Sequence, residues 1–258
     1  MSKGKIITFS IISFIVLLNI ILFGFVFRLR KQEVLLNDVT INSESIIKSA
    51  GLKNGKSIFL VDKDSAISNV EKAYPNIKVV QIKTIGVTKL QFIVRTRYPL
   101  YYSSVNDKFY ILDEELKVLE IETTEPNNLI KIETELDLNN AEVGNFVGTD
   151  KEKEISYKFF KAMYEAVIKT SGLQARQDIS AKVNSMKLEN NRLIIETLEG
   201  VKLDIENPSK DLTRKINIGF TKINSLITEG KSSELANSTI KIFYNSQEDE
   251  FCRYIKAE

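Results

Sequence analysis

Residues 6–27 carry no charged side chain and consist mainly of Ile, Leu, Val and Phe. At 1.5 Å rise per residue, a helix of this length extends roughly 33 Å, enough to cross the hydrocarbon core of a bilayer. A cleaved signal peptide is the alternative, but its apolar region is usually shorter, and the residues around Gly24 form no small-residue cleavage pattern. We therefore predict a transmembrane helix at 6–27, after a short cytoplasmic N-terminus at 1–5.

The charges around this segment do not choose its orientation. Lys3 and Lys5 precede it and three basic residues follow it, so the positive-inside rule favours neither side. Without Lys3 and Lys5, the 36 basic residues become 34, equal to the 34 acidic residues. A neutral domain has no broad electrostatic surface for nucleic acid, so none is expected as a partner.

The composition excludes several kinds of chemistry. The 258 residues include no His and a single Cys, Cys252. A chain without His has no imidazole base or metal ligand, and one Cys forms neither an internal disulfide nor a multi-cysteine metal site. With 43% hydrophobic and 27% charged residues, the chain is expected to fold around a core. The composition leaves carboxylate, lysine or tyrosine chemistry to any enzyme, and we expect no cofactor, metal or small-molecule substrate.

Residues 34–98 show the pattern of a small module in the order strand, helix, helix, strand, strand. A strand at 34–41 precedes a short helix that Gly51 ends in a left-handed conformation. A second helix, with its apolar positions on one face, ends at Pro75. Two β-rich runs complete the module at 77–83 and 89–97, and residues 28–33 are expected as a polar stalk before it.

Residues 99–245 are dominated by strands and contain two amphipathic helices. The pattern predicts a larger antiparallel-sheet domain with packed helices, and thus an α+β fold class for the chain. Strands are expected at 100–105, 108–112, 117–122, 185–189, 192–197, 201–205 and 239–245, and helices at 151–171 and 209–228. Residues 246–258 are acidic and polar, and we expect them to form a C-terminal tail.

Two short motifs imitate catalytic or nucleotide-binding signatures. Residues 51–57 resemble a phosphate-binding loop, but three residues rather than four separate the glycines, and the loop follows a helix instead of a strand. Ser45 and Lys48 form S-x-x-K, but the chain lacks the K-T-G strand of penicillin-binding enzymes. We interpret the first as a helix end followed by a turn, and the second as a solvated helix face.

Charged groups elsewhere are more ambiguous. The acidic groups at 113–115, 133–135 and 248–250 lack a calcium-loop pattern, and we interpret them as turns and exposed strand faces. Arg95 and Arg97 are two positions apart and are expected on one strand face. That face either binds an anionic partner or is simply solvated.

Several segments, in order, carry a family resemblance. Residues 50–62 read AGLKNGKSIFLVD, similar to G-L-x-x-G-x-x-I/L-F-x-V/I-D, and residues 74–80 read YPNIKVV, similar to x-P-x-V-x-x-V. Residues 89–99 read KLQFIVRTRYP, similar to L-x-I-x-V-x-E-R-x-P. With FYILD at 109–113 and the late strand TIKIFY at 239–244, these motifs resemble the FtsQ/DivIB family of bacterial cell-division proteins, whose first extracytoplasmic module is a POTRA domain.

The sequence also departs from that family pattern. Thr96 replaces the usual Glu, and Glu115 or Leu116 stands where a turn Gly is expected. Lys241 and Phe243 occupy the Asp and Arg positions of the late strand. These departures weaken a residue-for-residue transfer of partner contacts and leave the architecture intact.

The resemblance implies a non-enzymatic scaffold in the cell membrane. It implies a single-pass protein anchored in the lipid bilayer by residues 6–27, with its C-terminal domain extracytoplasmic and located at the division septum. Its partners are expected to be FtsL-like and FtsB/DivIC-like bitopic proteins, bound during septum formation.

The late strand at 239–245 is the expected binding edge, because an unpaired strand edge offers N–H and C=O groups to an incoming chain. Tyr244 matches the family's Tyr and serves either as an interface anchor or as a core residue. Alternation places Lys241 and Asn245 on the face opposite Tyr244. The candidate partner-binding residues are Ile240, Ile242, Phe243, Tyr244, Arg95 and Arg97.

Two other classes of protein stay open. One is a POTRA-bearing component of a protein translocation or envelope assembly system, which tandem modules or a membrane barrel would mark. The other is a membrane-anchored envelope enzyme, for which the sequence offers no recognisable nucleophile and base.

Overall fold

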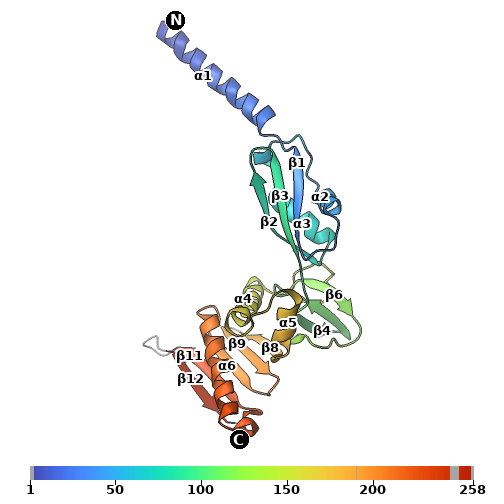
Figure 1. Ribbon diagram of the computed structural model, residues 1–258, viewed down its shortest axis with the longest axis vertical. Helices are drawn as coiled ribbons and strands as arrows, with labels where there is room; N and C mark the ends of the chain where they lie inside the picture. The colour runs from blue at the N-terminus through green and yellow to red at the C-terminus, as the bar shows by residue number, and fades with distance from the viewer. Residues whose placement is uncertain (1–2, 190, 245–249, 257–258) are drawn as a thin grey trace. The chain divides into compact units, whose positions relative to one another are not determined.

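A computed structural model of the chain describes residues 3–189, 191–244 and 250–256 (Figure 1). It divides into two compact units, Met1–Arg97 and Tyr98–Glu258. Each unit has its own hydrophobic core, and each is described by itself below.

The N-terminal segment is helical but changes its hydrogen-bonding pattern. An α-helix, α1 (Lys3–Ile21), is followed by a π-helical turn, η1 (Leu22–Val26), and the N–H of Phe27 donates to the carbonyl of Leu22 at 3.0 Å. In the part of the chain that the structure describes, no helix is both long and apolar enough to cross a membrane. The structure therefore does not confirm the transmembrane helix predicted at 6–27.

The first unit confirms the predicted order of strand, helix, helix, strand, strand. The strands form a three-stranded sheet in the order β1-β3-β2, with β1 parallel to β3 and β2 antiparallel to it. The sheet begins earlier than predicted, so the stalk expected at 28–33 is partly strand. The elements are β1 (Lys31–Asn37), α2 (Ser43–Ala50), η2 (Ile58–Leu60), α3 (Lys63–Ala73), β2 (Ile77–Ile85) and β3 (Lys89–Thr96).

Local sequence signals explain the helix ends of this unit. The Asn42 side chain caps α2 by accepting the N–H of Glu44, and Gly51 ends the helix at a φ of 69°. The Asp62 side chain caps α3 by accepting the N–H of Ser65. The apolar faces of both helices pack with the buried side chains of β3 into one core, of which the main members are Ile46, Ala50, Ala66, Val70, Leu90, Phe92 and Val94.

The second unit is built on a mixed sheet, and the prediction of an antiparallel one is wrong. In the described residues the sheet has nine strands in the order β12-β11-β10-β9-β8-β7-β4-β5-β6. Three of its pairs, β4 with β7, β7 with β8 and β10 with β11, are parallel. The strands are β4 (Tyr101–Val105), β5 (Lys108–Leu112), β6 (Val118–Glu122), β7 (Ile130–Ile132), β8 (Val183–Glu189), β9 (Arg192–Thr197), β10 (Lys202–Glu206), β11 (Thr239–Tyr244) and β12 (Glu250–Ile255).

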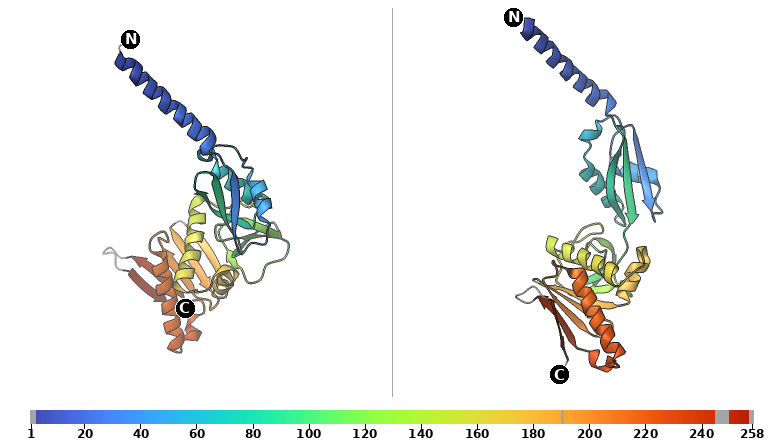
Figure 2. Two further views of the ribbon diagram at one scale, coloured as in Figure 1. Left: turned by 45° about the horizontal axis from the view of Figure 1, so that its top comes forward. Right: turned by 60° about the vertical axis from the view of Figure 1, so that its left-hand side comes forward.

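Helices cover one face of this sheet (Figures 1 and 2). They are α4 (Asp150–Ala166), α5 (Gly172–Ser180), α6 (Leu212–Thr228) and the short α7 (Ser232–Leu235). Thr149 and Glu152 form a capping box at the start of α4. The helix predicted at 151–171 is present but shorter, because α4 ends at Ala166 and Gly172, at a φ of 61°, begins a second helix.

The end of the chain differs most from the prediction. Residues 246–258 were expected as a polar tail, but Glu250–Ile255 form β12, which pairs antiparallel with β11. Lys256 follows the strand, and residues 246–249 and 257–258 of the predicted tail lie outside the described residues. The C-terminal segment is therefore part of the sheet.

Candidate partner-binding surfaces

The strand β11 carries four of the predicted partner-binding residues but is not the edge of the sheet. It lies between β10, to which it is parallel, and β12, to which it is antiparallel. Both sides of its backbone thus face another strand of the same chain. The prediction that this strand is an open binding edge is wrong, since β12 occupies the position expected for the partner.

Ile240 and Ile242 are core residues. Both side chains are fully buried and belong to the main cluster of the second unit. The helix α6 comes so close to this face that a Cβ added at Gly219 would lie 3.1 Å from Cδ1 of Ile242. Neither isoleucine is accessible to a partner in this fold.

Phe243 and Tyr244 are the other two candidate partner-binding residues on β11. Phe243 is half-buried and lies on the face away from Ile240 and Ile242. The backbone of Tyr244 pairs with Glu250, but its side chain lies outside the described residues. The choice between an interface role and a core role for Tyr244 therefore stays a prediction.

Among the described residues, β12 is the outermost strand on this side of the sheet. Along it, Arg253 and Ile255 are exposed, whereas Tyr254 lies opposite Ile240 and packs against the core. Cys252 lies opposite Ile242 in the same ladder. The aromatic and branched residues of the FCRYI run were the signal that could have identified this strand from sequence.

Arg95 and Arg97 do not share a strand face. The strand β3 ends at Thr96, so the alternation that led to this expectation stops between the two arginines. Arg95 is half-exposed on β3, in register with Asn37 of β1 and Lys78 of β2. Arg97 is 3% exposed.

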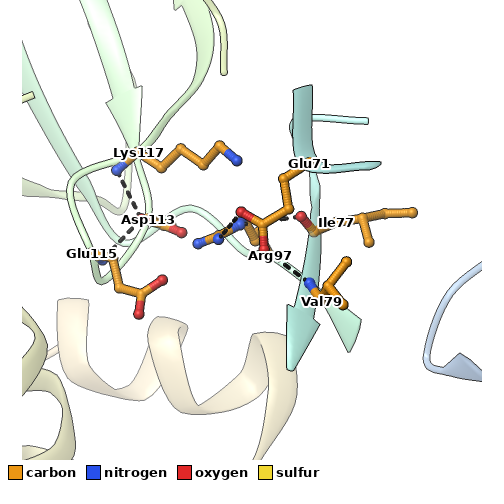
Figure 3. Close-up of polar contacts among 7 residues, drawn as sticks. All are labelled: Glu71, Ile77, Val79, Arg97, Asp113, Glu115 and Lys117. Atoms are coloured by element: carbon orange, nitrogen blue, oxygen red, sulfur yellow. Dashed lines mark hydrogen bonds and ion pairs between the residues drawn. The ribbon is translucent and has the colours of Figure 1, made fainter. Parts of the chain in front are cut away.

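Arg97 forms a buried structural contact within the first unit (Figure 3). Its Nη2 donates to Oε2 of Glu71 at 2.8 Å, and its Nε donates to the carbonyl of Ile77 at 3.2 Å. The other carboxylate oxygen of Glu71 accepts the N–H of Val79 at 2.9 Å. The pair connects α3 to β2, so we exclude Arg97 from the partner-binding surface.

The acidic group at 113–115 forms a turn, as predicted, but Asp113 and Glu114 are buried instead of exposed. One oxygen of Asp113 accepts the N–H groups of Glu115 and Lys117, at 2.8 and 2.9 Å, which closes a tight turn (Figure 3). At the end of that turn Leu116, one of the two residues that stand where a Gly was expected, adopts a φ of 59°. The carboxylate thus stabilises a strained backbone.

Glu114 forms an ion pair with Arg176 of α5, with 3.0 Å between Oε2 and Nη2. The guanidinium also lies over two aromatic rings, 4.4 Å from the centroid of Phe160 and 5.3 Å from that of Tyr98. Such an enclosed cation holds α5 and the turn together. The arrangement supports packing of this unit rather than capture of a ligand.

Two tyrosines in the second unit have a pKa that burial raises. Burial raises the pKa of Tyr101, whose hydroxyl donates to the carbonyl of Ser156 at 3.1 Å. Burial, and next the hydrogen bond to Glu125, raise the pKa of Tyr102 to about 12.

Among the residues that the structure describes, no three potential carboxylate or cysteine ligands cluster as a metal site would require.

Comparison with known proteins places the first unit in a family. Residues 30–94 match the sequence model described as "POTRA domain, FtsQ-type". The chain is 30% identical over 119 residues to the cell division protein DivIB of Clostridium botulinum (strain Hall), covering 46% of each protein. It is 36% identical over 81 residues to the DivIB of Clostridium tetani, covering 31% of this chain and 30% of the relative.

A solved structure also matches part of the chain. It is the major extracytoplasmic domain of the cell division protein DivIB from Geobacillus stearothermophilus, matched over 45% of this chain and 87% of that domain at 14% identity and a TM-score of 0.26. The matched region spans less than half the length of the Clostridium relatives.

Proposed function

We propose that this chain, whose FtsQ-type POTRA domain and similarity to DivIB proteins support the FtsQ/DivIB family of bacterial cell-division proteins, acts as a non-enzymatic scaffold of the division complex. The observation that carries the proposal is the FtsQ-type POTRA domain at residues 30–94, followed by a sheet domain that ends in an open strand. Such a chain offers surfaces for other proteins at both units. We expect its role to be the assembly of partners during septum formation.

We propose that residues 6–27 anchor the protein in the cell membrane. The uncharged sequence of this segment supports the proposal, as do the exposed apolar side chains along α1, among them Phe14 at 65% and Leu17 at 56% exposure. In a single-pass topology the POTRA domain and the sheet domain lie outside the cytoplasm. Confinement to the membrane plane then raises the effective concentration of bitopic partners.

We propose that β12 is the strand to which a partner adds. In the described part of the sheet β12 is the last strand, so its outer side has no neighbour. An extended segment of an FtsL-like or FtsB/DivIC-like protein can pair there through its backbone. Arg253 and Ile255 are exposed on β12, and Phe243 lies half-buried on the open face of the neighbouring strand.

Two experiments test the function. In growing cells of the source organism, an N-terminal fluorescent fusion is expected to form a mid-cell band that constricts with the septum. A uniform membrane signal throughout the cell cycle would contradict the divisome role and favour the translocation or envelope-assembly class.

Site-specific photocrosslinking tests the binding strand. A photoreactive residue at Ile255 on β12 is expected to capture a bitopic division protein in cells. The matched control is Ile227 on α6, which is 40% exposed, close to the 36% of Ile255. Equal capture at both positions, or capture at Ile227 alone, would contradict a partner on β12.

A further inference from the structure

Two loops of the POTRA domain are hydrogen-bonded to the last residue of the apolar segment and to the residues that follow it. The first loop, at 53–60, is held by three backbone hydrogen bonds: Ile58 N–H to Phe27 C=O at 2.7 Å, Leu29 N–H to Lys56 C=O at 2.8 Å, and Gly55 N–H to Leu29 C=O at 2.8 Å. The loop therefore lies where the chain leaves the N-terminal segment.

The second loop, at 85–88, joins β2 to β3 and meets the same stretch of chain. The N–H of Arg30 donates to the carbonyl of Thr88 at 2.8 Å, and the N–H of Lys31 donates to the same oxygen at 3.3 Å. We call the two loops, residues 53–60 and 85–88, the collar. Both are thus fixed to the backbone between Phe27 and Lys31.

The collar exposes large apolar side chains. Leu60 is 80% exposed and Phe59 is 61% exposed, while Val87 and Ile85 are 47% and 41% exposed. The Phe59 ring also packs edge-on against Phe27, with 5.1 Å between the ring centroids. Apolar groups gathered on one end of a domain are costly in water and mark a surface that is covered in the assembled state.

Basic side chains surround these apolar groups. Lys53 and Lys56 of the first loop are exposed, as are Arg28 and Arg30 of the segment between the loops. Of the nearby carboxylates, Glu33 pairs with Lys31 and Lys89, whereas Asp62 accepts hydrogen bonds from Ser65 that lower its pKa and leave it charged. Apolar groups with a basic rim are complementary to a bilayer that contains anionic lipids.

We propose that the collar lies in the headgroup region of an anionic bilayer and contacts lipid through Phe59, Leu60, Ile85 and Val87. The inference rests on the proposed membrane anchor at 6–27, since that anchor brings Phe27 and Leu29 to the bilayer surface. The backbone bonds to these two residues then hold the collar at the same level. The contact restricts how the POTRA domain rotates about its anchor.

A single tryptophan reports on this contact, because the chain has none of its own. The full-length Leu60→Trp variant is reconstituted in vesicles of phosphatidylglycerol and phosphatidylcholine that carry bromine near the top of the acyl chains. The matched control is Val80→Trp on β2, which is 51% exposed and roughly 17 Å along the strand from Ile85. We expect a blue-shifted emission and strong quenching at residue 60, and neither at residue 80.

The outcomes separate the contact from the anchor. Release of the wild-type protein from the vesicles by alkaline carbonate would overturn the anchor and the contact with it. Retention of the protein with an unquenched Leu60→Trp signal would overturn the contact alone. Quenching that appears only after a purified bitopic division protein is added would assign the collar to a protein partner and would also overturn the proposal.

The basic rim is tested on the same reporter. Substituting Lys53→Glu and Lys56→Glu together is expected to lower the quenching of Leu60→Trp in phosphatidylglycerol vesicles, and high salt is expected to do the same. The circular dichroism spectrum of the variant checks that the domain stays folded. Unchanged quenching in a folded variant would overturn the role of anionic lipid.

Discussion

Arg97 and Glu71 face each other across the end of the POTRA sheet, with 2.8 Å between Nη2 and Oε2 and with 2% and 12% of the two side chains exposed. The pair joins the end of the last strand to the second helix of the domain, because Arg97 directly follows β3 and Glu71 belongs to α3. In addition, Nε of Arg97 donates to the carbonyl of Ile77, and Oε1 of Glu71 accepts the N–H of Val79. Each charge is thus buried with its partners in place.

Replacing Arg97 with Ala is expected to destabilise the POTRA domain by about 3–5 kcal/mol, because it leaves the carboxylate of Glu71 buried without its counter-charge. Urea unfolding of the protein measures the change. Arg95→Ala is the matched control, since Arg95 is half-exposed, and we expect it to cost less than about 1 kcal/mol. Equal midpoints for the two variants would contradict the structural role of Arg97.

A second prediction concerns Leu116, which is fully buried at a φ of 59°. Both Leu116→Ala and Leu116→Gly lose the packing of the leucine side chain and are expected to destabilise the second unit by about 2–5 kcal/mol. Glycine adopts this backbone conformation without strain, so the Gly variant is expected to be more stable than the Ala variant by about 1 kcal/mol. Thermal unfolding ranks them. The opposite ranking would show that the turn rearranges.

The close approach of α6 to the sheet gives a third prediction. A Cβ at Gly219 would lie 3.0 Å from Cδ1 of Leu203 and 3.1 Å from Cδ1 of Ile242. Gly219→Val is therefore expected to destabilise the unit by about 1–3 kcal/mol, because branched methyl groups would overpack this contact. Asn217→Val on the exposed side of the same helix controls for helix propensity. Similar melting temperatures for the two variants would count against the contact.

The parts of the fold that the sequence predicted well depend on neighbours along the chain. Asn42, Gly51 and Asp62 act on the backbone within a few residues, so the helices of the first unit could be placed from their caps. The helix predicted at 151–171 was too long, because α4 ends at Ala166 and Gly172, with a positive φ, is the first residue of α5.

The parts that were missed depend on contacts between distant residues. Alternation put Arg95 and Arg97 on one face, but the buried partner of Arg97 is Glu71, which no local pattern indicates. Likewise, Ile240 and Ile242 looked like a binding strand until β12 paired beside them. Because the register of β11 with β10 and β12 is set by tertiary packing, the true edge strand could not be deduced from β11 itself.

The last prediction concerns alkaline stability. The hydroxyl of Tyr102 donates to Oε1 of Glu125 at 2.7 Å, and burial is the main reason that its pKa rises to about 12 in the folded protein. A tyrosine in the unfolded chain titrates near pH 10, so between roughly pH 10 and 12 the folded state holds the proton more tightly than the unfolded state. The protonated hydroxyl of Tyr102 therefore contributes its full stabilisation of the folded state below about pH 10, and this contribution is lost as the pH rises from about 10 to about 12.

Tyr102→Phe is expected to weaken the fall of the melting temperature in this pH range, whereas Tyr164→Phe, at an exposed position, is expected to leave that fall unchanged. An identical alkaline profile for wild type and Tyr102→Phe would show that Tyr102 ionises as readily in the folded protein as in the unfolded chain.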